Sequence, residues 1–300
     1  MLIVGKRTET NCALAAAFTG LGERAQVAER AALSHFRHGD VAIARLDVLP
    51  TLDGIEPGIW RLPRLEQHGV QVVNGPRALL AAHDKLATTR VLGLAGVAHP
   101  RTAHVRDGEG PPFPPPYVVK PRFGSWGRDV YLCRDEAELW ARLERLRRRR
   151  WFRLQGALVQ SLVEPTGRDL RIVVAGRRVV GAVERRALPG EWRTNVALGA
   201  VRRRVSPPAA TCALARSAVA ALGLDLAADD IAVDQDGRSY VLEVNGAVDF
   251  NETYADDVFA SAAAALLETD VTASGKKRNL VRAQVFATAY RRHSAGTPLS

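Results

Sequence analysis

Short apolar runs alternate with a helical pattern through the first part of the chain. Residues 2–4, 41–46 and 70–73 are short and largely aliphatic, as buried strands are. Residues 13–21 instead carry apolar side chains at helical spacing. This alternation predicts a small α/β domain over residues 1–84. No Gly-x-Gly-x-x-Gly follows the first strand, so the dinucleotide binding of a Rossmann domain is not expected.

The next stretch predicts a compact lid, placed at residues 85–160. Pro76 opens one helical pattern that runs through Asp84 and Lys85 and ends near Gly93 or Gly96. A loop rich in glycine and proline follows. Beyond the loop come three strand patterns, at residues 117–120, 129–133 and 157–163. One long helix with a capping-box start is predicted at residues 135–152.

Further patterns predict a core domain over residues 161–270 and a basic tail over residues 271–300. The core has two strands joined by a turn at Gly176, at residues 171–174 and 179–183. It also has two helices, at residues 211–222 and 255–267. Strands and helices mixed in this way predict an α/β (α+β) fold.

The composition indicates a folded protein and an expected cellular location. The chain has 300 residues, 47% of them hydrophobic, which suits two or three small domains. No apolar run approaches the roughly 20 residues of a membrane span, so no membrane partner is expected. The three cysteines are far apart and in no metal-ligand spacing, and we interpret them as reduced. A cytoplasmic location follows as the expectation, and a homo-oligomer is not excluded.

The chain is strongly basic, with a net charge of +10. Its basic clusters at residues 147–150, 202–204 and 276–278 are scattered and lack interleaved aromatic residues. We therefore do not expect a nucleic-acid partner, whereas an acidic substrate or an acidic protein fits the charge. Only five of the 42 basic residues are lysine, so each lysine is informative.

One hairpin pattern carries two carboxylates. Asp236-Gly237 is typical of a two-residue turn between antiparallel strands. Counting outward from this turn sets Ile231 opposite Leu242, and Asp230 opposite Glu243. Opposed Cβ atoms lie about 5 Å apart, so two bare carboxylates there would repel each other.

A divalent cation between Asp230 and Glu243 would remove this repulsion. Asn245 follows on the same face and completes a set of hard oxygen donors. We predict that these three residues hold Mg²⁺, with Mn²⁺ as a second candidate. A solvated hairpin with both carboxylates on its wet face is the alternative that this pattern alone leaves open.

Two of the rare lysines stand where phosphate groups could bind. Lys120 ends a strand and precedes a loop with Gly124 and Gly127, and such a loop can direct N–H groups at phosphate oxygens. Lys85 follows Asp84 on the earlier helix. Because the chain otherwise uses arginine, we interpret both lysines as compact charges beside a crowded polyphosphate. For the loop alone, a plain hairpin connection is the alternative.

Six short blocks along residues 70–267 occur in an order that resembles the ATP-grasp superfamily, and within it the ligases typified by RimK and LysX. The resemblance implies an ATP-grasp fold with an N-terminal pre-ATP-grasp domain, a small lid and a C-terminal core, and it implies ATP as a cofactor. In chain order the blocks are Asp84-Lys85-Leu86, Tyr117-Val118-Val119-Lys120, Leu158-Val159-Gln160-Ser161-Leu162-Val163, Gly167-Arg168-Asp169-Leu170-Arg171, Arg193-Thr194-Asn195 and Leu242-Glu243-Val244-Asn245.

The resemblance also implies roles for residues of these blocks. Lys85 and Lys120 would contact the phosphates of ATP, and Asp169 would lie on the nucleotide side of the cleft. Arg193 and Asn195 would act near the γ-phosphate. Arg171 would be a third catalytic residue. The nucleotide would also be bound by the adenine hinge, which is Gln160, Ser161, Leu162 and Val163, and by Thr194. The metal ligands would be Asp230, Glu243 and Asn245.

Departures from the family pattern leave the substrates open. Ser161 stands where relatives have an acidic residue, and Asn251 stands where the LysX-like pattern has a lysine. Phe250, in the same loop as Asn251, is either a core anchor or a substrate contact. A polar patch at residues 184–186 and 191–193 is either a clamp for a substrate carboxylate or a solvated hairpin.

The function that these features indicate is ATP-dependent carboxylate–amine ligation. A carboxylate attacks the γ-phosphate, and the resulting acyl phosphate is attacked by an amine to form an amide. The expected substrates are an amino acid such as glutamate and a carboxylate on a small molecule, a peptide or an acidic carrier protein. A non-catalytic nucleotide- or nucleic-acid-binding protein on the same fold is the alternative, and a kinase that stops at the acyl phosphate is a second one.

Overall fold

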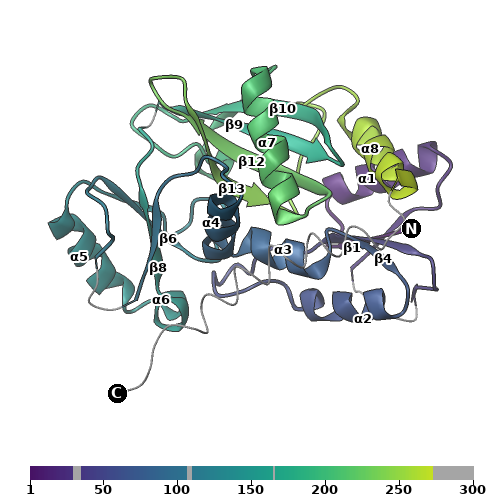
Figure 1. Cartoon of the computed structure of the whole chain (residues 1–300), viewed down its shortest axis with the longest axis horizontal. Coiled ribbons are helices and arrows are strands. Elements are labelled where there is room, and N and C mark those ends of the chain that lie inside the picture. Colours follow the sequence, from purple (N-terminus) through teal and green to yellow (C-terminus); the bar gives the residue numbers. More distant parts are fainter. Residues whose placement is uncertain (30–34, 107–109, 165, 273–300) are drawn as a thin grey trace.

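The computed structural model describes residues 1–29, 35–106, 110–164 and 166–272, and these residues form three β-sheets with helices packed on them (Figure 1). The predicted mixture of helix and sheet is confirmed. The boundaries of the predicted domains stay a prediction. Apart from its first two residues, the predicted tail lies outside the described residues.

A parallel four-stranded sheet, ordered β2-β1-β3-β4, forms the N-terminal part. Helix α1 packs on one face and α2 on the other, so the strands are almost wholly apolar. The elements are β1 (Leu2–Gly5), α1 (Glu9–Gly20), β2 (Gln26–Ala28), β3 (Val41–Arg45), the 3-10 helix η2 (Pro57–Arg61), α2 (Leu62–Gln67) and β4 (Gln71–Val73).

The next helical pattern forms two helices, so the prediction of a single helix was wrong. Helices α3 (Pro76–His83) and α4 (Lys85–Leu94) meet at Asp84, whose φ of −87° and ψ of 96° are extended. The Asp84 carboxylate accepts hydrogen bonds from the N–H groups of Leu86 and Ala87 and thereby caps α4. Lys85 is therefore the first residue of a helix.

The lid is an antiparallel four-stranded sheet ordered β5-β8-β6-β7. Its predicted long helix is also two helices, because Arg149 is extended and the chain turns there to bury Trp151 and Phe152 in the lid core. Asp135 does cap the first of them by accepting a hydrogen bond from the Glu138 N–H. The elements are β5 (Thr102–Val105), β6 (Tyr117–Pro121), β7 (Tyr131–Cys133), α5 (Glu136–Leu146), α6 (Arg150–Gln155) and β8 (Ala157–Ser161).

The core is an antiparallel five-stranded sheet ordered β11-β10-β9-β12-β13. The edge strand β11 follows the 3-10 helix η3, and Gly223 ends α7 in a left-handed conformation. The elements are β9 (Arg168–Ala175), β10 (Arg178–Arg186), η3 (Val196–Leu198), β11 (Val201–Arg204), α7 (Ala209–Leu222), β12 (Leu226–Val233), β13 (Ser239–Asn245) and α8 (Val258–Thr272).

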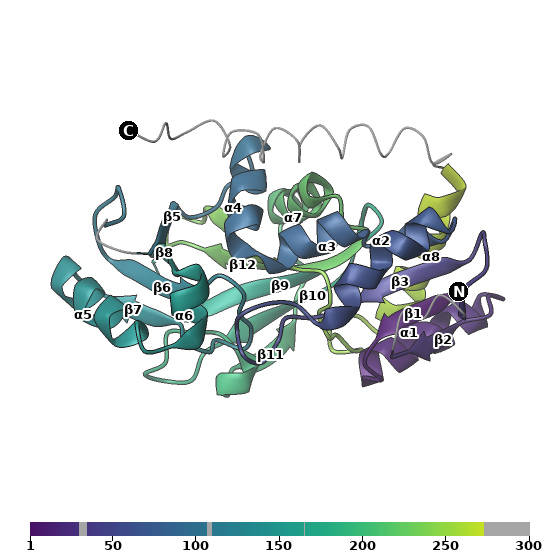
Figure 2. The ribbon, with the colours of Figure 1, turned by 90° about the horizontal axis from the view of Figure 1, so that it is seen from below.

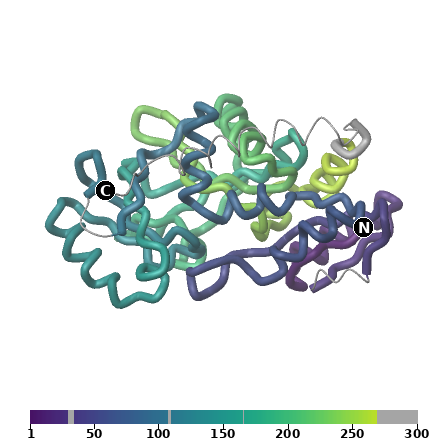
Figure 3. The backbone as a smooth tube through the Cα atoms, turned by 60° about the horizontal axis from the view of Figure 1, so that its bottom comes forward, coloured from purple at the N-terminus to yellow at the C-terminus, as the bar shows by residue number. Residues whose placement is uncertain are grey.

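Helices cover part of both faces of this sheet (Figure 2). Ile172 and Val174 of β9 pack toward α3, α4 and α7. Val173 and Ala175 point to the other face, where α8 and α1 lie side by side although they are far apart in sequence (Figure 3). At the end of the sheet beside the lid, charged side chains of β9, β10, β12 and β13 line a cavity; among them are Asp169, Arg171, Arg185, Asp230 and Glu243.

The hairpin of β12 and β13 has a different register from the predicted one near its turn. The loop has three residues, 235–237, and is closed by a 3.0 Å hydrogen bond from the Asp234 N–H to the Arg238 carbonyl oxygen. Ile231 therefore pairs with Val241. A bulge between Ile231 and Asp230 then shifts the pairing by one residue. The predicted pairing of Asp230 with Glu243 is correct because the two shifts cancel.

None of the helices in the described ranges is long and apolar enough to cross a membrane. Cys12, Cys133 and Cys212 are all free thiols.

Candidate active site

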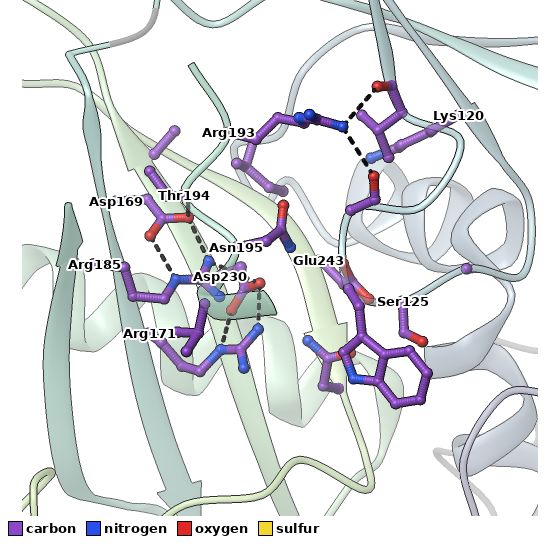
Figure 4. A pocket seen from close by; sticks show the side chains of 18 of the residues that line it. Lys120, Ser125, Asp169, Arg171, Arg185, Arg193, Thr194, Asn195, Asp230 and Glu243 are labelled. Atoms are coloured by element: carbon purple, nitrogen blue, oxygen red, sulfur yellow. Dashed lines mark hydrogen bonds and ion pairs between the residues drawn. The ribbon is translucent and has the colours of Figure 1, made fainter. Parts of the chain in front are cut away.

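The lid, α4 and the five-stranded sheet surround a cavity of about 480 Å³ (Figure 4). Its walls include β6, β8, the loop at residues 121–130 and the loop at residues 187–200. The structure brings together all of the predicted site residues, whose individual roles stay predictions. Those lining the cavity are Lys85, Lys120, Gln160, Ser161, Leu162, Val163, Asp169, Arg171, Arg193, Thr194, Asn195, Asp230, Glu243 and Asn245.

The two lysines lie on different walls of the cavity. Lys85 Nζ, at the start of α4, donates to Glu243 Oε1 at 2.9 Å and to the Gly124 carbonyl oxygen at 2.6 Å. Lys120 Nζ, on β6, donates to Gln160 Oε1 at 2.8 Å. Burial, reinforced by the neighbouring charge of Lys85, lowers the pKa of Lys120 to about 8. Lys120 can therefore bind an anion without breaking an ion pair, since its hydrogen-bond partner is the neutral amide of Gln160.

Arginines surround Asp230 on the floor of the cavity (Figure 4). Arg171 donates Nε to Oδ1 at 2.7 Å and Nη2 to Oδ2 at 2.8 Å, and Arg185 Nη2 lies 3.0 Å from Oδ2. Burial alone would raise the pKa of Asp230, but the two guanidinium groups outweigh it and hold that pKa below its usual value. With Lys85 on Glu243, cationic side chains neutralise the opposed carboxylates that the sequence pattern left bare.

Asp169 extends this charge network toward the loop at residues 187–200. Arg185 Nε donates to Asp169 Oδ1 at 2.7 Å, Arg185 Nη2 donates to Oδ2, and Thr194 Oγ1 donates to Oδ2 at 2.6 Å. Burial raises the pKa of Asp169, and the Arg185 charge opposes that rise. Arg185 therefore bridges Asp169 and Asp230 and fixes the spacing of β9, β10 and β12 side chains at the floor.

Arg193 connects the loop at residues 187–200 to the lid. It donates Nη1 to the carbonyl oxygens of Gly127 and Val130, at 3.2 and 3.4 Å, and it is held by both oxygens of Glu191. The hydrogen bonds from Arg193 lower the pKa of Glu191 to about 2. Gly127 has a φ of 69°, and a Cβ there would meet Asn195 Oδ1 at 2.6 Å, so only glycine fits this approach.

The predicted adenine hinge is partly occupied by lid contacts. The Ser161 N–H donates to the Arg101 carbonyl oxygen at 2.8 Å, and the Leu162 N–H donates to that of Pro116 at 3.1 Å. The Val163 N–H has no hydrogen-bond partner within the described part of the chain, so it is the one of these three N–H groups that is left available. Gln160 is instead a link in the lid, since it accepts from Lys120 and donates to Thr102 Oγ1.

The donors beside Asp230 fit a magnesium ion. Within the described ranges, no group of three or more His, Cys, Asp or Glu side chains is arranged to hold a metal. Asp230, Glu243 and Asn245 nevertheless offer two carboxylates and an amide, and carboxylate oxygens that accept one hydrogen bond keep further lone pairs. The Asn245 side chain has no described hydrogen-bond partner, and its Nδ2 is buried. A cation held by so few protein groups would complete its shell with water and phosphate oxygens.

Arg185 is the site residue whose role the sequence pattern did not reveal. Counting outward from the turn at Gly176 would set Asp169 opposite Glu184. A bulge between Val179 and Gly181 shifts β10 by one residue, and Asp169 pairs with Arg185 instead. The only sequence signal was the polar patch that includes residues 184–186, for which the alternatives were a substrate clamp and a solvated hairpin, and neither is a bridge between two buried aspartates.

The arginines of that patch are already engaged by acidic groups. Arg186 Nε donates to Glu184 Oε1, as Arg185 does to Asp169 and Arg193 to Glu191. A carboxylate clamp from these residues would have to break existing ion pairs.

Phe250 is a core anchor rather than an exposed contact. Its side chain is 2% exposed and stacks on Phe259, with 5.2 Å between the ring centroids. Of the two readings of this position, the structure therefore supports packing.

An ATP-grasp ligase is the class that this fold and cavity define. Residues 82–268 match the model of the RimK-like ATP-grasp domain. The chain belongs to the RimK-like ATP-grasp family. The predictions of an ATP-grasp fold, of ATP as a cofactor and of a carboxylate–amine ligase are confirmed, and the non-catalytic alternative is not favoured.

Similar proteins include both curated ligases and solved ligase structures. The chain is 32% identical over 215 residues to a "Probable alpha-L-glutamate ligase" of Sodalis glossinidius, covering 70% of each chain. It is 29% identical over 249 residues to the tetrahydromethanopterin:alpha-L-glutamate ligase of Methanosarcina acetivorans, covering 70% of this chain and 76% of that one. The structure of the ATP-grasp ligase PsnB with minimal precursor, Mg and ADP has a TM-score of 0.63 at 18% identity, over 89% of this chain and 97% of PsnB.

Proposed function

We propose that this ligase joins the amine of an amino acid, such as glutamate, to a carboxylate of a small molecule, a peptide or a carrier protein. Two relatives named as glutamate ligases support glutamate as the amino acid. The observation that carries the proposal is the meeting, in one cavity, of two lysines, the Arg193–Asn195 segment and the opposed carboxylates Asp230 and Glu243.

Lysines and backbone donors would bind the nucleotide. Lys120 would hold a phosphate, because its present partner is neutral and a phosphate would restore its full charge. Lys85 would exchange the Glu243 carboxylate for a phosphate oxygen close by. The Val163 N–H would receive the base. Asp230, Glu243 and Asn245 would hold Mg²⁺, which when bound neutralises phosphate charge.

The chemistry then needs mostly position and charge. The substrate carboxylate attacks the γ-phosphorus, the bond to the β,γ-bridging oxygen breaks, and ADP and an acyl phosphate form. The amine attacks the acyl carbon, loses a proton and displaces inorganic phosphate, which leaves the amide. Arg193 would stabilise the charge of the transferring group beside Asn195, while Arg171 would hold Asp230 in place. The lid residues over the cavity would exclude water from the anhydride.

The proposed setting is the cytoplasm, where ATP is available and free cysteines persist. The net positive charge of the chain favours the binding of an acidic or carboxylate substrate by electrostatic attraction. Nucleic acid is not proposed as a partner.

A panel of carboxylates and amino acids, scored for ADP release and for product mass, tests the proposal. One pair should release ADP and phosphate and give a product whose mass is the sum of both substrates minus water. Lys120→Met should lose this activity, while Arg216→Met, exposed on α7 and outside the cavity lining, should retain it. Failure of every pair to release ADP would overturn the proposed function.

Hydroxylamine tests the intermediate. With the active carboxylate, ATP and Mg²⁺, it should replace the amine and give a hydroxamate with one ADP per product. Release of AMP and pyrophosphate would mean adenylation of the carboxylate and would refute the acyl-phosphate route.

A further inference from the structure

Most basic side chains that line the cavity already have a hydrogen-bonding partner. Lys85 pairs with Glu243, and Lys120 with Gln160. Arg168, Arg171, Arg185 and Arg193 each contact an aspartate or a glutamate. Two cavity arginines lack an acidic partner within the described residues. They are Arg128, which stacks over Trp126 on the lid loop at 4.6 Å, and Arg202.

Arg202 lies on the edge strand β11, directly opposite Arg185 of β10. Directly opposed residues of an antiparallel pair point to the same face, so both side chains belong to the floor of the cavity. Arg202 is half-buried and forms no hydrogen bond or ion pair with any residue in the described ranges. Two like charges in this position destabilise the strand pair unless an anion joins them. Arg185 is paired with Asp169 and Asp230, whereas Arg202 has no acidic partner among the described residues.

The neighbouring arginines on β11 have other roles. Arg204 holds the chain at residues 252–256, because its Nη2 donates to the Glu252 carbonyl oxygen at 2.5 Å and to Asp256 Oδ1 at 2.7 Å. Arg203 pairs across the strand with Glu184, which places its side chain on the opposite face of the sheet from Arg202. Of the three successive arginines, Arg202 alone lines the cavity.

The position of Arg202 separates it from the predicted phosphate site. Strand order sets β11 three strands away from β12, which carries Asp230. At the usual strand spacing this is about 14 Å between backbones. At that distance Arg202 makes no contact with the predicted metal ligands, and the KM for ATP of an Arg202 variant distinguishes a phosphate-binding role from an amino-acid-binding one. Arg202 can instead reach a second charged group of a substrate whose reacting atom lies near Asp230.

We propose that Arg202 is a specificity-determining residue that binds a carboxylate of the amino-acid substrate, one that does not react. This assignment rests on the proposed function and names the part of the cavity that selects the amine. A free amino acid always carries such a carboxylate, and an acidic one carries two. A planar guanidinium matches a carboxylate through two parallel hydrogen bonds. The pair would also supply the counter-charge that Arg202 lacks among the described residues.

Steady-state kinetics of Arg202→Gln, with Arg203→Gln as the matched control, test the assignment. The assay uses ATP, Mg²⁺ and the pair that the panel identifies, with L-glutamate as the first amino acid. In Arg202→Gln the KM for the amino acid should rise at least tenfold, while the KM for ATP stays within twofold and kcat changes little. Arg202→Lys should recover part of the loss. Amides of the amino acid should be poor substrates of the wild type and should lose nothing further in Arg202→Gln.

The remaining readouts separate a binding role from a structural one. The free Arg202→Gln protein should melt no lower than wild type, because a like charge has been removed from beside Arg185. An unchanged KM for the amino acid, a raised KM for ATP, or a lower melting temperature would each overturn the assignment. If the wild type releases ADP and Arg202→Gln has the same KM for the amino acid, only the assignment of Arg202 is refuted. If the wild type releases no ADP with any substrate pair, the proposed function is refuted as well.

Discussion

Asp229 and Asp230 are neighbours on β12, yet the two faces of the sheet give their carboxylates opposite surroundings. Asp230 points into the cavity, where Arg171 faces it from β9 and Arg185 reaches it from β10. Asp229 points to the other face, between Ile172 and Val244. It is fully buried, and neither of its oxygens has a described hydrogen-bond partner.

The pKa values of the two carboxyls differ for this reason. Burial raises the pKa of Asp229 well above its usual value, and the adjacent negative charge of Asp230 adds to that rise. Burial acts on Asp230 as well, but its arginines reverse the effect. The comparison shows that burial alone does not determine the charge of a side chain. The cross-strand partners do, and they change with every residue along a strand.

The largest effect is expected for Asp230→Ala. Removing this carboxylate leaves Arg171 without its partner and Arg185 with one partner fewer, and breaking a buried ion pair from one side costs about 3–5 kcal/mol. The free energy of unfolding in urea should fall by about that amount, and ATP turnover should be lost. Asp236→Ala, in the exposed turn of the same hairpin, should change stability little. An unfolding free energy equal to wild type would contradict the comparison.

The opposite sign is expected for Asp229→Val. An unpaired buried polar group destabilises a protein by about 1–3 kcal/mol, so replacement by an aliphatic side chain among apolar neighbours should stabilise the fold by a similar amount at pH 8. Chemical denaturation at this pH measures the gain. A loss of stability would mean that the Asp229 carboxyl has a partner that the comparison overlooks.

The pH dependence of Asp229→Asn isolates the ionisation. The native pKa of Asp229 is raised, so at low pH both folded and unfolded states are protonated, and stability falls as pH rises above the unfolded value near 4 toward the native one. Asn cannot ionise. Its stability relative to wild type should therefore increase between pH 4 and pH 8, and a difference that stays constant over this range would contradict the assignment.

Lys120 extends the comparison to a buried cation that lacks a carboxylate partner. Its compact ammonium fits between Gln160 and the expected phosphate, and a flat guanidinium would not. Lys120→Arg keeps the charge but should lower kcat/KM for ATP by roughly tenfold. Arg90→Lys, outside the cavity, controls for the exchange itself. Equal kinetics for Lys120→Arg and wild type would show that charge alone is required.

The smallest expected effect is a pH dependence of nucleotide affinity. Free Lys120 loses its proton as pH rises through about 8, and a bound phosphate would favour the protonated form. The Kd for a non-hydrolysable ATP analogue should therefore rise roughly fourfold from pH 7 to pH 8.5, with proton uptake on binding. Calorimetry in buffers of different ionisation enthalpy measures that uptake. Lys120→Arg should show no such rise over the same range.

Local patterns were sufficient for much of the architecture. Apolar runs located most strands because a strand buried on both faces needs a continuous apolar sequence. The short strands at residues 26–28, 102–105 and 201–204 were not anticipated, since each has only three or four residues, includes polar ones and is mostly half-buried or exposed. Asp84 and Arg149 broke two predicted helices, because a single extended residue interrupts a helix without altering the apolar spacing on either side of it.

The chemically important residues could also be read from the chain, but the contacts among them could not. Lys85 and Lys120, the Arg-Thr-Asn block and the paired acids all line the cavity. The pairing of Asp230 with Glu243 was predicted correctly only because a longer turn and a bulge cancel. No such cancellation occurs on β10, where the bulge exchanges Glu184 for Arg185 opposite Asp169.

Sequence alone was enough to place the chain among ATP-grasp ligases, because that assignment depends on the identity and order of short local blocks. Which charges neutralise one another was a matter of three-dimensional structure. One inserted residue in a strand redirects every side chain beyond it, and the position of an edge strand depends on contacts between distant segments. Arg202 is the clearest case: within three successive arginines it is one basic residue among many. Only the packing of β11 against β10 brings it to the cavity floor, where it has no partner among the described residues.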